Sequence, residues 1–413
     1  MWVWIAYFNP HRFTYGVAYN FPVSTVVGIP TILGIIFSIR KLNRGIFVRE
    51  TVLLLLFWGW MILSYLNATR TELFSDHIDD ALIHLTLVSK VLLMTFILIL
   101  VVTTKERLNT LFILTALCFG VLAIKGSLFG ARTEGDFRVW GPPDSFVYDN
   151  NDLGLALNMS LPMMYYLARS VVSRYLRVIL WLCFGSSILV VILTYSRGAL
   201  LGLAVVLGTL ALRSRQKLLS AATLVLVAVL ILAFAPPAWM ERMGNFAHGQ
   251  LDQSAEGRLH AWQFAWVFAC EYPITGGSFE TFTPQLEARF TPQFSFAGPH
   301  SIYFQTLGEQ GFVGLALLLT LVGSCFFSLW RLRRRVRRQP SFVWISDFCK
   351  MLETSLLGFL VSGAFLPRAY FDLWFQLAAG TALLKILYRK ERLQQLAQNE
   401  VPPEAEQLEV AAV

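Results

Sequence analysis

Long apolar runs alternate with short polar segments along most of the chain. Each run approaches the ~20 residues that a helix needs to cross a bilayer core. Met1–Asn9 is apolar too, but at 1.5 Å per residue it reaches only about 13 Å, so it counts as a partial span. The pattern predicts an all-α, polytopic integral membrane protein with about twelve transmembrane helices. Besides the partial span, the predicted spans are 21–39, 50–67, 81–102, 107–124, 152–168, 175–194, 197–212, 218–235, 302–330, 349–366 and 370–388.

One long polar segment interrupts the array. It opens with Pro236-Pro237, and Gly257–Glu271 within it has the pattern of an amphipathic helix that ends before Pro273. After the last span the chain is polar and acidic, which is typical of a disordered tail. The predicted organisation is N-terminal transmembrane helices over 1–235, a helical loop over 236–301, C-terminal transmembrane helices over 302–393 and a disordered cytoplasmic tail over 394–413.

Charge adds an orientation to this pattern. Only 15% of the residues are charged and 56% are hydrophobic, whereas a soluble protein carries roughly 25% charged residues. Lysine and arginine gather in alternate loops, and such loops face the cytoplasm. Both termini are then inside, and the long polar segment faces outward. The net charge of +8 therefore reflects topology and does not indicate nucleic-acid binding.

Several common classes of site are missing from the sequence. It contains no nucleotide-binding glycine loop, no CxxC pair and no HExxH motif. The 6 histidines are spread over the chain, and the 5 cysteines lie scattered in apolar runs. We therefore predict neither a metal site nor a cofactor.

Two arginines on the outward side are candidates for binding an anion. Arg197 follows Ser196 at the junction of two apolar helices, where an arginine either anchors at the interface or binds a lipid phosphate. Arg258 lies in the first turn of its predicted helix, with Trp262 one turn on. Free backbone N–H groups and a guanidinium would together form an anion site, although Glu256 could simply cap the helix.

His300 lies where the outward segment re-enters the membrane. A neutral imidazole, with an ordinary pKa near 6.5, can accept a proton as a general base, although a histidine here could equally cap the helix or face solvent. Lys90 is a further candidate because it lies inside an apolar helix. The supporting outward candidates are Lys125, Arg138, Tyr303, Glu309, Arg368 and Asp372, of which Arg368 and Asp372 could pair with each other.

The order of these motifs resembles the O-antigen ligase and polymerase superfamily. They are Ser-Arg-Gly at 196–198, Gly-Arg-x-x-x-Trp at 257–262 with Pro-x-x-Gly-Gly at 273–277, and His-Ser-x-Tyr at 300–303 with Glu-x-Gly at 309–311. The resemblance covers about residues 150–390, and 9–16 also resemble the N-terminal region of O-glycosylation ligases. Ser301 departs from the family pattern, in which asparagine is common at this position.

The resemblance implies a GT-C-type glycosyltransferase with one large periplasmic loop in a bacterial inner membrane. Its donor would be a glycan on undecaprenyl diphosphate, and its acceptor a hydroxyl of lipid A–core. His300 would be the base, Arg197 and Arg258 would hold the diphosphate, and the reaction would be metal-independent and inverting. An O-antigen polymerase and a protein O-oligosaccharyltransferase share this donor, so both remain alternatives. A transporter or flippase is less favoured, because the charged candidates gather on one side and the spans show no paired breaks.

Overall fold

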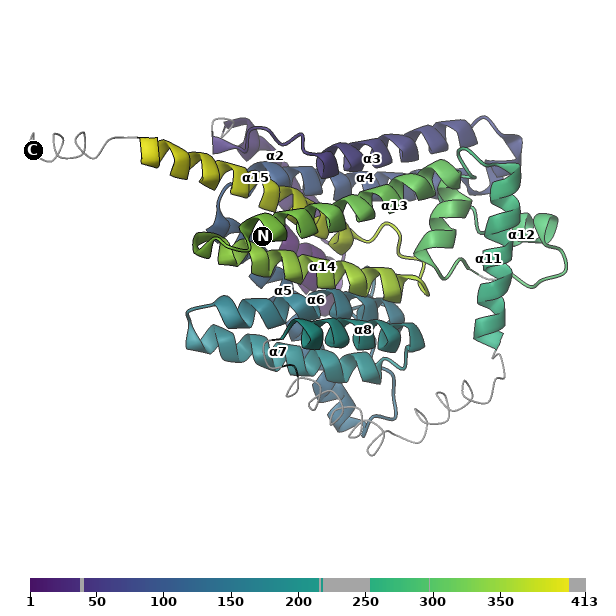
Figure 1. Ribbon diagram of the computed structural model, residues 1–413. Helices are drawn as coiled ribbons and strands as arrows, with labels where there is room; N and C mark the ends of the chain where they lie inside the picture. Colours follow the sequence, from purple (N-terminus) through teal and green to yellow (C-terminus); the bar gives the residue numbers. More distant parts are fainter. Residues whose placement is uncertain (38–40, 215–216, 218–252, 297, 401–413) are drawn as a thin grey trace, which may run out of the picture.

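The computed structural model describes residues 1–37, 41–214, 217, 253–296 and 298–400, and in these ranges its regular elements are helices (Figure 1). The predicted span 218–235, the start of the long loop and residues 401–413 lie outside the described residues. The helices are α1 Trp2–Phe8, α2 Val23–Phe37, α3 Arg49–Ala68, α4 Ile78–Val101, α5 Lys105–Arg132, α6 Asn150–Ser170, α7 Arg174–Leu193, α8 Arg197–Arg213, α11 Gln253–Glu271, α12 Pro284–Phe290, α13 Ile302–Val336, α14 Val343–Gly363 and α15 Asp372–Glu400.

Five of the described helical stretches are long and apolar enough to cross a membrane. They coincide with predicted spans, which confirms the membrane character expected from the sequence. The expected total of about twelve stays a prediction. The five stretches are Arg49–Ala68, Glu72–Val101, Lys105–Arg132, Arg174–Leu193 and Ile302–Val336.

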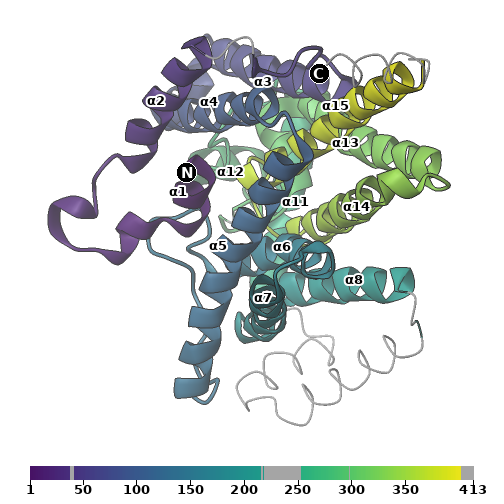
Figure 2. The same cartoon turned by 90° about the vertical axis from the view of Figure 1, so that its left-hand side faces the viewer.

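The central helix α6 is not among these five stretches, so hydropathy and length alone underestimate the number of helices in the array. Figure 2 shows it between α5, α7, α8 and α14, which all contact it. It is buried along nearly its whole length, so it packs on protein rather than lipid. A helix in this position can carry polar residues if they are hydrogen-bonded. Asn158, for example, donates to the carbonyl oxygen of Ala199 at 2.7 Å and to Ser362 Oγ at 3.0 Å.

Two predicted boundaries need correction. The helix α11 begins at Gln253 instead of Gly257, because the preceding Gln-Ser-Ala-Glu continues the helix. Arg258 therefore lies in its second turn and cannot use the free N–H groups of a helix start. At the other end of the chain, α15 continues to Glu400. Residues 394–400, which are rich in good helix formers, are helical rather than part of a disordered tail.

The helix α11 runs across one end of the array, crosswise to α13 (Figure 1). Its position is fixed where the segment 273–277 meets a break in α13 at Gly311 (φ 66°, ψ −172°). Phe312 N donates to Pro273 O at 2.9 Å, and Gly277 N donates to Gly308 O at 3.1 Å. The two glycine motifs noticed in the sequence therefore pack on each other and hold α11 against the membrane helices.

Candidate active site

His300 lies directly before α13, in a strained backbone conformation. Its φ of 40° is in the left-handed region, which is uncommon for a residue with a side chain and is often found at functional positions. The next residue, Ser301, caps α13 by accepting a hydrogen bond from Tyr303 N at 3.3 Å. The cap and the break at Gly311 together fix the first turns of α13, directly after His300.

The surroundings of His300 keep its imidazole neutral. Burial lowers its pKa below the ordinary 6.5, the neighbouring Arg258 guanidinium lowers the pKa further, and the Asp149 carboxylate opposes this by raising it. The net pKa is lowered. A histidine must be neutral to accept a proton, so this environment suits a general base at neutral pH.

Trp262 connects α11 to both sides of His300. Its Nε1 donates to the carbonyl oxygen of Pro299 at 3.2 Å. Its ring stacks on Phe304, with the centroids 5.0 Å apart and the planes 11° from parallel. Because Arg258 lies one turn before Trp262 on the same helix, these contacts hold the guanidinium beside the imidazole. The second and third sequence motifs thus meet at one place.

The Ser-Arg-Gly turn joins this place through the start of α6. Ser196 caps α8 by accepting from Ala199 N at 3.2 Å, so Arg197 is the first residue of the helix. Asn150 Nδ2 donates to the carbonyl oxygen of Thr194 at 2.7 Å, which binds the turn to the N-terminus of α6. The N-cap of α6 is Asp149, the carboxylate that acts on His300. The turn that carries Arg197 is therefore joined to the start of α6, where Asp149 acts on His300.

Arg368 pairs with a different acid from the one suggested by spacing. Its partner is Asp152 in the first turn of α6, a buried carboxylate, and not Asp372 four residues on. Proximity in sequence is outweighed here because the fold brings Arg368, in the loop before α15, to the first turn of α6. Next to Arg368, Ala369 N donates to Gln305 Oε1 at 3.0 Å, which joins this loop to α13.

Glu309 belongs to a buried polar cluster farther along α13 than His300. Gln305 Nε2 donates to Glu309 Oε1 at 3.4 Å. The His84 side chain, near the start of α4, lies close to Glu309 and forms an ion pair with Glu280 at 2.5 Å. The hydrogen bond from His84 lowers the pKa of the Glu280 carboxyl. Sequence reasoning missed Glu280 and Asp149; only their positions in outward loops hinted at them.

The remaining candidates lie apart from the imidazole. Tyr303 donates its hydroxyl to the carbonyl oxygen of Leu360 at 3.1 Å, so it fastens α13 to α14. Lys125 lies over the ring of Phe13 at 4.1 Å and shares a cavity of about 190 Å³ with Arg138. The structure does not bring these three side chains to His300.

A larger, mainly apolar cavity of about 790 Å³ lies between α1, α2 and α4. Ile29, Ile32 and Leu82 are among its apolar lining residues, and Lys90 and Asp372 also line it. Lys90, inside an apolar helix, therefore faces a cavity large enough for part of a lipid chain. Asp372 links this cavity to the start of α15 and so to the loop that carries Arg368.

Two family profiles match the chain. Residues 180–319 match the O-antigen ligase family, and residues 1–172 match a family of unknown function. No curated protein matches. The first match includes Arg197, Arg258 and His300. Over this domain the chain is similar to the O-antigen ligase family, and this similarity supports glycan transfer of the ligase or polymerase type.

Proposed function

We propose that the protein is an O-antigen ligase. It transfers a glycan from undecaprenyl diphosphate to a hydroxyl of lipid A–core, at the periplasmic face of a bacterial inner membrane. The observation that carries this proposal is the neutral His300 imidazole beside the Arg258 guanidinium, where α11 crosses the end of the array. A base next to an anion-binding cation is what attack by a hydroxyl on a sugar diphosphate requires.

In the proposed reaction the acceptor hydroxyl loses its proton to His300 as its oxygen attacks the anomeric carbon. The bond from that carbon to the diphosphate oxygen breaks in the same step, and the electron pair leaves with undecaprenyl diphosphate. A single displacement inverts the anomeric configuration. Arg258 and Arg197 bind the diphosphate, and their guanidiniums stabilise the charge that develops as it leaves, which is the role a metal ion has in other enzymes.

Arg258 also couples donor binding to the strength of the base. In the free enzyme its positive charge contributes to the lowered pKa of His300. A bound diphosphate offsets that charge, so the imidazole becomes more basic when the donor is in place. The base is then strongest in the complex that reacts.

The apolar cavity between α1, α2 and α4 is the proposed place for the donor's polyprenyl chain. Its lining is mainly apolar and its volume, about 790 Å³, suits part of a long hydrocarbon. The proposal includes a GT-C-type fold with about twelve spans, of which five candidates are described, and with both termini in the cytoplasm. It also includes N-terminal transmembrane helices over 1–235, a periplasmic loop over 236–301 and C-terminal transmembrane helices from residue 302 onward.

Transfer from purified lipid-linked glycan to purified lipid A–core tests the proposal directly. We expect the acceptor to gain the glycan without added divalent metal and in the presence of a chelator. Extension of the lipid-linked glycan without modification of lipid A–core would contradict the ligase and favour the polymerase. Transfer to a protein serine or threonine would favour a protein O-oligosaccharyltransferase, and movement of the donor across the bilayer without transfer would favour a flippase.

Deletion of the gene separates the same alternatives in the cell. Loss of a ligase leaves bare lipid A–core while lipid-linked polymer accumulates. Loss of a polymerase leaves cores that carry a single unit. Unmodified glycoprotein with normal lipopolysaccharide would indicate protein glycosylation.

A further inference from the structure

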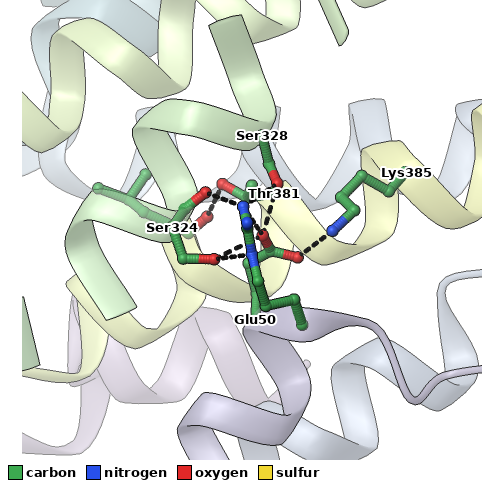
Figure 3. Close-up of polar contacts among 7 residues, drawn as sticks. Glu50, Ser324, Ser328, Thr381 and Lys385 are labelled. Carbon is green, nitrogen blue, oxygen red and sulfur yellow. Dashed lines mark hydrogen bonds and ion pairs between the residues drawn. The ribbon is translucent and has the colours of Figure 1, made fainter. Parts of the chain in front are cut away.

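A second polar network lies farther along α13, away from α11. At its centre is Glu50, whose side chain is completely buried (Figure 3). Its carboxylate accepts hydrogen bonds from Lys385 Nζ at 2.5 Å and Ser328 Oγ at 2.6 Å. Ser324 Oγ donates to the same carboxylate at 2.9 Å. The network joins α3, α13 and α15, and ionisable groups at such positions in a membrane protein usually have a function.

The same serines hold a second cation. Arg49 Nε donates to Ser324 Oγ at 2.7 Å, and its Nη2 donates to Ser328 Oγ at 3.0 Å. The guanidinium also lies over the ring of Phe327, 5.0 Å from the centroid. One carboxylate thus fixes two cations, Arg49 and Lys385, and neutralises only one of them.

These two cations line a cavity of about 310 Å³ together with three further arginines, Arg331, Arg335 and Arg389. Arg331 and Arg335 are four residues apart on α13, as are Lys385 and Arg389 on α15, so the like charges repel. No acidic side chain is among the lining residues. Within the described part of the chain, the three arginines form no ion pair. The cavity therefore has a strongly positive potential that an anion would relieve.

Exposed apolar side chains lead from the helix surfaces to this cavity. On α3, Val52, Leu56 and Leu63 follow Arg49 at helical spacing and are all exposed. On α13, Leu319 and Phe327 are exposed and precede Arg331 at the same spacing. Apolar stripes that end in converging cations match a phospholipid, with its chains along the helices and its phosphate among the cations.

We propose that this cavity binds the headgroup of an anionic phospholipid. The proposal does not depend on the transfer reaction. An excess of basic residues in the loops alone would follow from topology. Topology does not explain why five cations from three helices converge around one buried carboxylate.

The test uses the full-length purified protein in detergent. Dioleoyl phosphatidylglycerol is titrated in, with dioleoyl phosphatidylethanolamine and inorganic phosphate as separate arms, and binding is followed by the midpoint of thermal unfolding. We compare wild type with Arg331→Gln/Arg335→Gln/Arg389→Gln. The matched control, Arg44→Gln/Arg338→Gln/Arg392→Gln, removes the same charge from exposed positions at the same end that do not line the cavity.

Phosphatidylglycerol should raise the unfolding midpoint of wild type and of the control, and phosphatidylethanolamine should not. Each cation near an anionic lipid strengthens binding by about fivefold, so the cavity variant should bind on the order of a hundredfold more weakly. If that variant fails to fold, Arg389→Gln alone should weaken binding about fivefold. Equal loss in the cavity and control variants would overturn the proposal, because the attraction would then be diffuse. A full stabilising effect of inorganic phosphate would overturn the lipid assignment, and no effect of phosphatidylglycerol on wild type would overturn the site.

Discussion

The contact between the segment 273–277 and the break in α13 predicts a large difference between two glycine substitutions in one helix. At Gly311, φ is +66°, and an added Cβ would lie 2.7 Å from the carbonyl carbon of Ile274 and 2.8 Å from Pro273 O. With ψ at −172°, this conformation is essentially restricted to glycine and costs a side-chain residue about 1–3 kcal/mol. Overpacking against backbone adds about 1–3 kcal/mol. Gly311→Ala should therefore destabilise the protein by about 2–6 kcal/mol.

Gly323→Ala is the matched control. This glycine lies in the same helix in a helical conformation, and nothing lies within 4 Å of its added Cβ. Alanine should be neutral there or stabilising by about 0.5–1 kcal/mol. Thermal unfolding in detergent, followed by tryptophan fluorescence, compares the two. Gly311→Ala should also lose transfer activity at temperatures where it is folded, because α11 carries Arg258. Indistinguishable unfolding of the two variants would refute the docking argument.

Three further predictions concern the site. Asp149→Asn keeps a good N-cap but removes the charge that raises the pKa of His300. The acid limb of the pH profile of kcat/KM should therefore move to lower pH. An acid limb at the same or a higher pH would contradict the influence of Asp149 on His300. In wild type the acid limb of kcat should lie at higher pH than that of kcat/KM, since bound diphosphate offsets the positive charge of Arg258 and raises the pKa of His300. Acid limbs at the same pH would argue against this coupling between donor binding and the basicity of His300. Asp152→Asn breaks the pair with Arg368 and should destabilise the protein by about 1–3 kcal/mol in thermal unfolding, whereas no change would show that the pair contributes nothing.

The sequence predicted the position of the central helix α6 about as closely as those of α3 and α7, but it did not predict the packing partners of α6. Helices such as α3 and α7 are apolar because part of their surface faces hydrocarbon, so their length and position could be read directly. The helix α6 faces other helices on every side, and its polar residues, such as Asn158, are satisfied by partners far along the chain. Hydropathy cannot identify those partners. The start of α11 was also misplaced, because Gln253–Glu256 continue the helix before Gly257.

For the site, sequence motifs supplied candidate residues but not the contacts among them. The segments that contain Gly276 and Gly311 pack on each other so closely that neither position leaves room for a Cβ. This contact between distant segments can be seen only in the folded backbone. The partner of Arg368 and the influence of Asp149 on His300 are likewise contacts between distant segments. Placing Arg258 beside His300 needed the stacking of Trp262, which no spacing in the sequence predicts.

The central claim is that His300 is the base in glycan transfer. The most direct measurement is the transfer rate of purified His300→Ala from lipid-linked glycan to lipid A–core. His260→Ala, which removes a histidine of α11 that stacks on Phe294, serves as the control. With unchanged unfolding behaviour, the His300 variant should be slower by about 10²–10⁴-fold, while the control keeps most of its activity. Full activity of a folded His300→Ala enzyme would contradict the account.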